Sequence, residues 1–283
     1  MERIDLHAHT TASDGTLTPS ELVDLARREG LKAVAVTDHD TLDGLSEALA
    51  RAREIGLELV PGVEISAEFK PGTMHILGYY LEPDASELAA RLAELQEARR
   101  TRNPKIISRL AELGIEISMA EVENLAGGGQ VGRPHMAKAL VGKGYVSSID
   151  EAFNRYLAKG GPAYVEKFRL SPTQAVRMIR EAGGTPVLAH PFTLRLDESG
   201  LKDTARQLEE AGLEGIEVYY PEHTPQMTRD YLALARAFNL IPTGGSDFHG
   251  ENKAGVELGR GFGDLAVSYD LLADMKQRRK ERT

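Results

Sequence analysis

The sequence predicts an α/β protein in which seven strands close into a barrel that carries one helical insertion. Three observations support this prediction. Seven short apolar segments alternate with helical segments, an order typical of a parallel sheet. Each of these seven segments ends on a histidine or an acidic residue, or on a loop that carries one, which favours functional groups gathered at one mouth of a barrel. One long stretch, residues 84–165, has helical periodicity and almost no strand pattern.

The first third of the chain reads as repeated strand–helix units. Thr18-Pro19-Ser20-Glu21 is a capping box with proline at the first helical position, so a helix is expected to begin at residue 19. A second helix is expected from about Leu42, and Gly56 should end it. Four strand-like segments flank these helices: residues 3–6, 32–37, 58–63 and 74–80.

Residues 84–165 differ from the segments on either side. Leucine and isoleucine residues recur there at helical spacing, and Asn103-Pro104 predicts a break or kink between two helices. Pro134 is expected to open a further helix. Because strand–helix units resume afterwards, we expect residues 84–165 to be a helical insertion that caps one barrel, itself formed by residues 1–83 and 166–283.

The last third returns to the strand–helix pattern. Ser171-Pro172-Thr173-Gln174 is a second capping box. Helices are expected around residues 201–211 and 225–238. Three strand-like segments complete the set of seven: residues 185–189, 215–219 and 240–243.

Bulk composition excludes several classes of protein. The chain of 283 residues contains no cysteine, so disulfides and thiolate metal sites are impossible. The net charge of −9 argues against a protein that grips long duplex nucleic acid through its phosphates. No apolar run approaches the length of a membrane span. A strand is expected by residue 3, which leaves no room for a signal peptide, so a cytoplasmic location is expected.

Histidines and carboxylates gather around the strand ends. His7 and His9 lie two residues apart in an extended segment, so their side chains point the same way. Imidazole and carboxylate ligands suit zinc, manganese or iron, and a carboxylate such as Glu64 can bridge two ions. The sequence therefore predicts a multinuclear metal site formed by six histidines and three acidic residues: His7, His9, His39, His75, His190, His249, Asp14, Glu64 and Asp247.

The motifs HAH, SDG, TDHD, GVE, HILGY, AHP and SDFH, in this order, closely resemble those of the PHP (polymerase and histidinol phosphatase) family. The resemblance covers residues of both flanks, about 1–80 and 165–283. It implies a distorted (β/α)7 TIM-like barrel that holds two or three divalent ions, Mn²⁺, Zn²⁺ or Fe²⁺. It also implies three groups of ligands: His7, His9, Glu64 and Asp247; Asp14, His39 and His249; and Glu64, His75 and His190. Some relatives carry histidine at the position of Asp14.

Such a centre predicts the hydrolysis of phosphoric esters. Cations lower the pKa of water and neutralise charge on a phosphoryl oxygen. Asp38 and the non-ligand histidine His223 are the candidates for handling the proton of the leaving group.

The insertion indicates which kind of substrate the protein binds. Arg133, His135 and Lys138 lie near one predicted helix start, where phosphate binding is favoured. The length of the insertion and its R-x-H segment resemble the PHP subgroup that removes the 3′-phosphate of nucleoside 3′,5′-bisphosphates. Related members trim short 5′-phosphorylated RNA from its 5′ end. The resemblance thus implies a nucleotide or short RNA as substrate, selected by a 5′-phosphate pocket.

Three other functions fit parts of the pattern. A small-metabolite phosphatase such as histidinol phosphatase would use the same metals without a grip on a second phosphate. A non-catalytic metal-binding module that regulates a partner is a second alternative. A metal-dependent C–N hydrolase is the third, although no lysine lies at a strand end to serve as the carbamylated ligand of such sites.

Overall fold

The computed structural model describes residues 2–83, 86–127, 131–166 and 169–282. Within these ranges, eight strands form one sheet in the order β7-β6-β5-β4-β3-β2-β1-β8. The strands are β1 (Arg3–Asp5), β2 (Ala33–Val36), β3 (Glu58–Ala67), β4 (Met74–Tyr79), β5 (Thr185–Leu188), β6 (Gly215–Tyr219), β7 (Ile241–Gly244) and β8 (Val267–Ser268). The amide of Leu6, directly after β1, donates to the carbonyl of Gly244 in β7 at 3.2 Å. The sheet is therefore a nearly closed barrel, and the predicted fold class is confirmed.

Strand β4 runs opposite to both of its neighbours, β3 and β5. The remaining pairs from β1 to β3 and from β5 to β7 are parallel. The parallel arrangement predicted from the strand–helix pattern therefore does not hold at this strand, and His75 stands near the start of its strand. The reason is the short connection, residues 68–73, because a parallel neighbour needs a crossover of a dozen or more residues. The reversal brings the start of β4 to the mouth where the parallel strands end.

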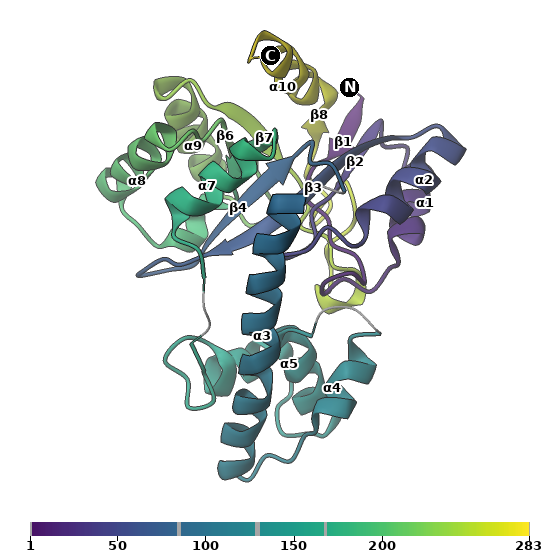
Figure 1. Cartoon of the computed structure of the whole chain (residues 1–283), viewed down its shortest axis with the longest axis vertical. Helices are drawn as coiled ribbons and strands as arrows, with labels where there is room; N and C mark the ends of the chain where they lie inside the picture. Colours follow the sequence, from purple (N-terminus) through teal and green to yellow (C-terminus); the bar gives the residue numbers. More distant parts are fainter. Residues whose placement is uncertain (1, 84–85, 128–130, 167–168, 283) are drawn as a thin grey trace.

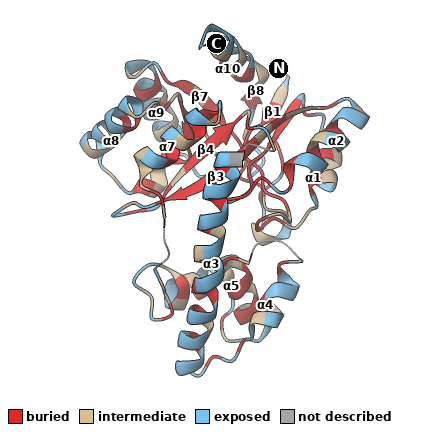
Figure 2. Cartoon of the chain, in the orientation of Figure 1, coloured by how far each residue is buried: buried red, intermediate tan, exposed pale blue. Residues whose placement is uncertain are grey.

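Six helices surround the barrel: α1 (Pro19–Arg28), α2 (Leu45–Ile55), α7 (Pro172–Glu181), α8 (Glu198–Glu210), α9 (Pro225–Ala237) and α10 (Tyr269–Arg282) (Figure 1). Both predicted capping boxes are formed, at Thr18 and Ser171. Helix α2 begins three residues later than expected, at Leu45. The strands are buried while the helices expose their outer faces (Figure 2). No helix of the described residues is long and apolar enough to cross a bilayer.

Apolar side chains alternate between the two faces of the sheet. On β2, Ala33 and Ala35 belong to the cluster inside the barrel, whereas Val34 and Val36 pack with the surrounding helices. Burial of one such valine contributes about 1.5–3 kcal/mol to stability. Leu272 and Met275 of α10 join the inner cluster, so this helix closes one end of the barrel. The opposite end is left for polar groups.

Below the barrel in Figure 1 lies a group of helices formed by α3 (Ser86–Glu112), α4 (Met119–Leu125), α5 (Arg133–Gly142), α6 (Ile149–Ala152) and a π-helical turn, η1 (Phe153–Leu157). These helices share an apolar cluster of their own. Helix α3 runs without interruption through Pro104, so of the predicted break or kink the break was wrong. Its first half packs into the barrel cluster through Leu88 and Leu92, and its second half packs into the helical cluster through Ile106 and Leu110. This packing offsets the cost of a proline inside a helix, about 3 kcal/mol.

Candidate metal centre and active site

The structure brings the side chains of all nine predicted metal ligands together at the open mouth of the barrel. Three follow β1, and others follow β2, β5 and β7 or lie in β3 and β4. Two of them have left-handed backbone conformations, His190 with φ 23° and Asp247 with φ 53°. Such conformations are uncommon for residues with a side chain and cluster at functional sites.

One group consists of His7, His9, Glu64 and Asp247. The Nε2 atoms of the two histidines lie 3.2–3.3 Å from Oε2 of Glu64 and 3.1–3.3 Å from Oδ1 of Asp247. Four ligands that share a tetrahedral ion, with bonds of about 2.0–2.1 Å, lie about 3.3–3.4 Å apart. The spacing of this group is therefore that of ligands around one ion.

A second group contains Asp14, His39 and His249 together with His9. Oδ1 of Asp14 lies 3.3 Å from Nε2 of His249 and 3.8 Å from Nδ1 of His9, and Oδ2 lies 3.9 Å from Nε2 of His39. The ring of His9 thus stands between this group and the first one. The sequence motifs implied the other three residues of this group but not the participation of His9.

Glu64 faces the remaining imidazoles with its other oxygen. Its Oε1 lies 2.8 Å from Nδ1 of His75 and 2.9 Å from Nε2 of His190. Its Oε2 lies 3.1 Å from Nδ1 of His39, in addition to the contacts with the first group. The two oxygens of one buried carboxylate therefore face different sets of imidazoles, an arrangement suited to a bridging ligand.

Besides their spacing, the hydrogen bonding of the ligand atoms also fits divalent ions. Four buried ring nitrogens have no hydrogen-bond partner in the described part of the chain: Nε2 of His7, Nδ1 and Nε2 of His9, and Nδ1 of His39. A buried polar atom left unpaired costs about 1–3 kcal/mol. Ligation by a cation satisfies one nitrogen of each of these three rings, so the cluster is able to bind metal.

The electrostatics of the cluster favour charged carboxylates. Burial by itself would raise the pKa of Glu64, but the neighbouring imidazoles, His39 first, hold it well below its ordinary value. The same balance of burial against His39 and His249 lowers the pKa of Asp14. Burial lowers the pKa of His39 to about 3, which keeps its ring neutral. Ionised carboxylates and a neutral imidazole are the forms that bind metal.

Two histidines of the first group behave differently. Burial opposes the protonation of His9, yet the nearby carboxylates of Asp247 and Glu64 raise its pKa to about 10. The pKa of His7 is also raised, because Glu217, Glu64 and Asp247 outweigh its burial. A divalent ion bound here would displace these protons, so metal binding would release protons.

Sequence reasoning missed the groups that hold the ligands in place. Glu217, a charged residue inside the apolar strand β6, contacts Nδ1 of His7 through Oε1 at 3.0 Å. Tyr220 and Lys253 donate to Oδ2 of Asp247, each at 2.8 Å, which leaves Oδ1 facing the imidazoles. The signal for Glu217 was available, because a carboxylate in the middle of a buried strand needs a partner.

The two candidates for proton handling lie outside the ligand groups. Asp38 is buried, and both of its oxygens accept hydrogen bonds from Thr10 and Ser13, three bonds at 2.7 Å. His223 donates from Nδ1 to the carbonyl of Val218 at 2.9 Å, and its Nε2 is buried without a partner among the described residues. Its ring packs against Phe192, with centroids 5.5 Å apart.

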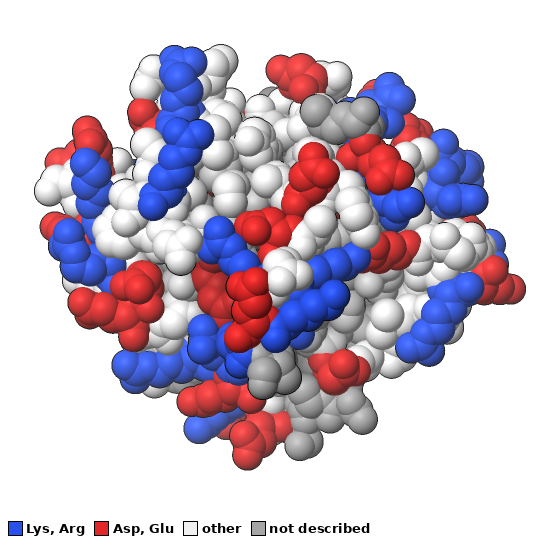
Figure 3. Space-filling view, turned by 90° about the horizontal axis from the view of Figure 1, so that it is seen from above, with Lys and Arg blue, Asp and Glu red and all other residues white. Residues whose placement is uncertain are grey.

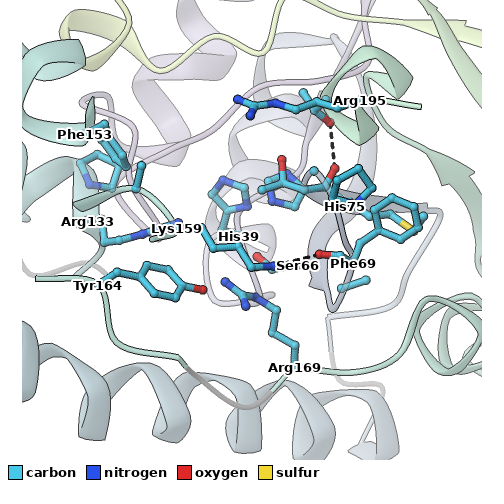
Figure 4. Close-up of a pocket in the computed structure, with 18 of the residues that line it drawn as sticks. His39, Ser66, Phe69, His75, Arg133, Phe153, Lys159, Tyr164, Arg169 and Arg195 are labelled. Carbon is cyan, nitrogen blue, oxygen red and sulfur yellow. Dashed lines mark hydrogen bonds between the residues drawn. The ribbon is translucent and has the colours of Figure 1, made fainter. Parts of the chain in front are cut away.

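A cavity of about 470 Å³ opens beside the ligands (Figure 4). Its lining includes Asp14, His39 and His75 and also five basic residues: Arg102, Arg133, Lys159, Arg169 and Arg195. Arg133 donates to the carbonyl of Leu157 at 2.9 Å. Its guanidinium lies 5.6 Å from the ring centroid of Phe153 and 5.5 Å from that of Tyr164. One continuous space therefore joins the ligand cluster to cationic groups.

Two of the three predicted phosphate-binding residues do not line this cavity. His135 is buried, and its Nδ1 accepts from the amide of Gly132 at 3.0 Å at the start of α5. Lys138 contacts Oδ1 of Asn252 at 3.4 Å. The sequence identified only Arg133 of the five basic lining residues, because the other four come from segments that local patterns do not connect.

Comparison with known proteins places this geometry in context. The PHP domain family matches residues 5–241. The 5'-3' exoribonuclease Rnm of Escherichia coli is 37% identical over 262 residues, which cover 90% of this chain and 88% of the relative. A 3',5'-nucleoside bisphosphate phosphatase of Chromobacterium violaceum is 33% identical over 267 residues, which cover 92% and 91%. A crystal structure from Bifidobacterium adolescentis, of a protein assigned as a metal-dependent phosphoesterase, is similar with a TM-score of 0.87, 31% identity and coverage of 98% and 96%.

Proposed function

This chain belongs to the PHP domain family and is a metal-dependent phosphoesterase, and we propose that it removes the 3′-phosphate of nucleoside 3′,5′-bisphosphates. The observation that carries the proposal is the shared cavity, in which metal ligands and a separate set of cations face the same space. A substrate with two phosphates matches this arrangement. One phosphate would lie at the ligand cluster, and the other would lie among the basic residues of the insertion.

The nine ligands would hold two or three ions, Mn²⁺, Zn²⁺ or Fe²⁺. Bound ions would supply a water nucleophile at neutral pH and positive charge opposite the phosphoryl oxygens. The chain itself orients the substrate. The carbonyl of Leu157 and the rings of Phe153 and Tyr164 fix the plane of the Arg133 guanidinium at the cavity wall. A guanidinium fixed in this way is suited to a terminal phosphate.

Residues 84–165 act in this proposal as a cap that completes the substrate site rather than as a separate domain. Arg102, Arg133 and Lys159 come from this segment, and Ser66, Phe69 and Arg195 come from the barrel. The amide of Gln96 donates to the carbonyl of Asp40 at 3.1 Å, and Lys159 donates to the carbonyl of Phe69 at 3.2 Å. These two bonds join the cap to the rim of the barrel.

Of the two proton candidates, we propose His223 for the leaving group and a structural role for Asp38. Donation from Nδ1 of His223 to Val218 leaves Nε2 as the atom that takes up or gives the proton. Burial lowers the pKa of His223, so Nε2 must first take up a proton from water, and the resulting imidazolium is a stronger acid that gives this proton to the leaving oxygen. The carboxylate of Asp38 is already engaged on both oxygens.

The test is an activity panel with metal analysis of the same sample. Adenosine 3′,5′-bisphosphate should be the best substrate, ahead of histidinol phosphate and 4-nitrophenyl phosphate. Arg133→Ala should lower kcat/KM on the bisphosphate by about 10–100-fold, the equivalent of one or two charged hydrogen bonds. It should change activity on 4-nitrophenyl phosphate little, because that ester lacks a second phosphate.

Lys138→Ala is the matched control for this substitution, since Lys138 lies on the same helix but outside the cavity. Its kinetics should equal those of the wild type. Preference for histidinol phosphate would favour the small-metabolite phosphatase instead. An equal loss on both kinds of ester in Arg133→Ala would contradict the assignment of Arg133.

A second activity, trimming of short 5′-phosphorylated RNA from the 5′ end, is favoured by Arg195. This residue is exposed, follows the turn that carries His190, and lines the same cavity from the barrel side. Its side chain makes no hydrogen bond or ion pair with the residues that the structure describes, and its backbone amide donates to the carbonyl of Phe192. In Figure 4 it lies above His39 and His75, apart from Arg133 and Lys159 at the left. A cation in that place suits the next phosphate of a longer chain.

Arg195→Ala should therefore lower kcat/KM about tenfold on a 5′-phosphorylated trinucleotide, the loss of about one phosphate contact. Activity on adenosine 3′,5′-bisphosphate should stay within twofold. Arg177→Ala, an exposed arginine of α7 outside the cavity, serves as the control. Equal losses on both substrates would remove the argument for a site that is specific to RNA.

Long duplex nucleic acid remains an unsuitable partner in this proposal. On the face shown in Figure 3, lysine and arginine side chains are interspersed with aspartate and glutamate. That face therefore lacks the basic tract that phosphate-dominated binding needs, within the described residues. The cations relevant to substrate lie in the cavity, where they suit a nucleotide or a short strand.

A further inference from the structure

Glu217 is a fully buried carboxylate behind the ligand cluster. It interrupts the apolar strand β6 between Ile216 and Val218. A buried carboxylate without partners would destabilise the fold, so hydrogen-bond partners must offset the cost of its burial. None of the three ligand groups includes it.

Its two oxygens contact two different predicted ligands. Oε1 lies 3.0 Å from Nδ1 of His7, and Oε2 accepts from the backbone amide of His190 at 2.8 Å. The contact with His7 turns the opposite ring nitrogen, Nε2, toward Glu64 and Asp247, which lie 3.3 Å away. The contact with His190 holds a residue whose backbone is in the uncommon conformation with φ 23°.

We propose that Glu217 is a positioning residue that sets the metal affinity of the centre through His7 and His190 together. The inference rests on the proposed metal centre and goes beyond its ligand set. A carboxylate can only accept a hydrogen bond, so Nδ1 of His7 must carry the proton. The lone pair of Nε2 is then free for an ion. The same carboxylate ties the strand end that carries His7 to the turn that carries His190.

A glutamine at this position would reverse part of this arrangement. The glutamine amide has one accepting oxygen and one donating nitrogen, whereas both neighbours, Nδ1 of His7 and the backbone amide of His190, are donors. If its oxygen accepts from His190, its NH₂ group faces Nδ1 of His7 and favours the tautomer with the proton on Nε2. That proton occupies the atom that would ligate the ion, so Glu217→Gln should weaken metal binding without a change in size.

The experiment measures the affinity of the metal-free protein for Zn²⁺ and Mn²⁺ by competition with a chelating dye. Glu217→Gln should bind about 10–100-fold more weakly than the wild type. Asp5→Asn is the matched control, because Asp5 is also fully buried. It accepts from backbone amides of His7, Ser246 and Gly259 and from the Ser246 hydroxyl, but touches no imidazole nitrogen. Its metal affinity should stay within about threefold of the wild type.

Wild-type affinity in Glu217→Gln, or an equal loss in Asp5→Asn, would overturn the proposal. Should Glu217→Gln fail to fold, nitrogen NMR of the zinc-loaded wild type decides the matter. A proton on Nδ1 of His7 supports the proposal, and a bare Nδ1 overturns it. No substrate enters either measurement, so failure to hydrolyse a bisphosphate would refute the proposed substrate and leave this inference standing. A wild type that binds no metal would instead refute the centre itself.

Discussion

At the scale of single residues, the site depends on side chains that present different atoms to different neighbours. Glu64 turns Oε2 to His7, His9 and His39, and Oε1 to His75 and His190. The backbone of Glu64 is fixed as well, since its amide donates to the carbonyl of Asp38 and its carbonyl accepts from the amide of Asp40. A carboxylate held in this way can bridge ions without loss of side-chain freedom on binding.

His223 gives a test at the same scale. Asparagine at this position can still donate to the carbonyl of Val218 but has no counterpart of Nε2. His223→Asn should therefore lower kcat by about 10²–10⁴-fold, the usual contribution of a general acid or base, with little change in KM. Steady-state kinetics on adenosine 3′,5′-bisphosphate provide the measurement. A kcat equal to that of the wild type would rule out a role for His223 in proton transfer.

At the scale of elements, the loop after β1 is positioned by Asp38 at the end of β2. This carboxylate accepts from the amide and hydroxyl of Thr10 and from the hydroxyl of Ser13. Asp14, the neighbour of Ser13, is thereby held opposite His249. One buried carboxylate just beyond the adjacent strand thus holds the loop in place.

Replacement of that carboxylate should lower the free energy of unfolding by a measurable amount. Asp38→Ala leaves three donors without their partner and should lower the free energy of unfolding by roughly 2–4 kcal/mol. Asp43→Ala, at an exposed position nearby, should change it by less than about 0.5 kcal/mol. Urea denaturation of the metal-free proteins separates the two outcomes. Equal stabilities would show that Asp38 does not anchor the loop.

At the scale of the whole molecule, the ligand cluster joins the ends of most barrel strands. Ligands lie in or after β1, β2, β3, β4, β5 and β7, and residues of α3 and α5 line the cavity beside them. Ions bound at this mouth would connect segments that are far apart in sequence. Occupancy should therefore stabilise the entire fold, because an unfolded chain has no preformed site.

Metal removal tests this expectation. An ion present at about 1,000 times its Kd stabilises the folded state by about 4 kcal/mol per site. A chelator should therefore lower the Tm of the wild type by several degrees, and added Mn²⁺ or Zn²⁺ should restore it. His9→Ala, which removes a member of two ligand groups, should show a much smaller response. If the chelator left the Tm of the wild type unchanged, this would contradict a metal centre at this mouth.

Local patterns in the sequence determined much of this molecule. The alternation of strand and helix predicted the barrel, because pleat and helical periodicity are properties of short segments. Capping boxes predicted the starts of α1 and α7 for the same reason. The ligand motifs were visible because each lies beside a single strand, and the structure brings their side chains together.

Only the tertiary structure decided the rest. The direction of β4 and the continuity of α3 through Pro104 depend on a short loop and on packing at both ends of a helix. Arg133, Arg169 and Arg195 line one cavity although they come from separate segments of the chain. Glu217 contacts His7, which lies far away in the sequence. Spacing along a sequence carries no information about such contacts, because they arise from the closure of the barrel and the position of helices α3 to α6 beside its mouth.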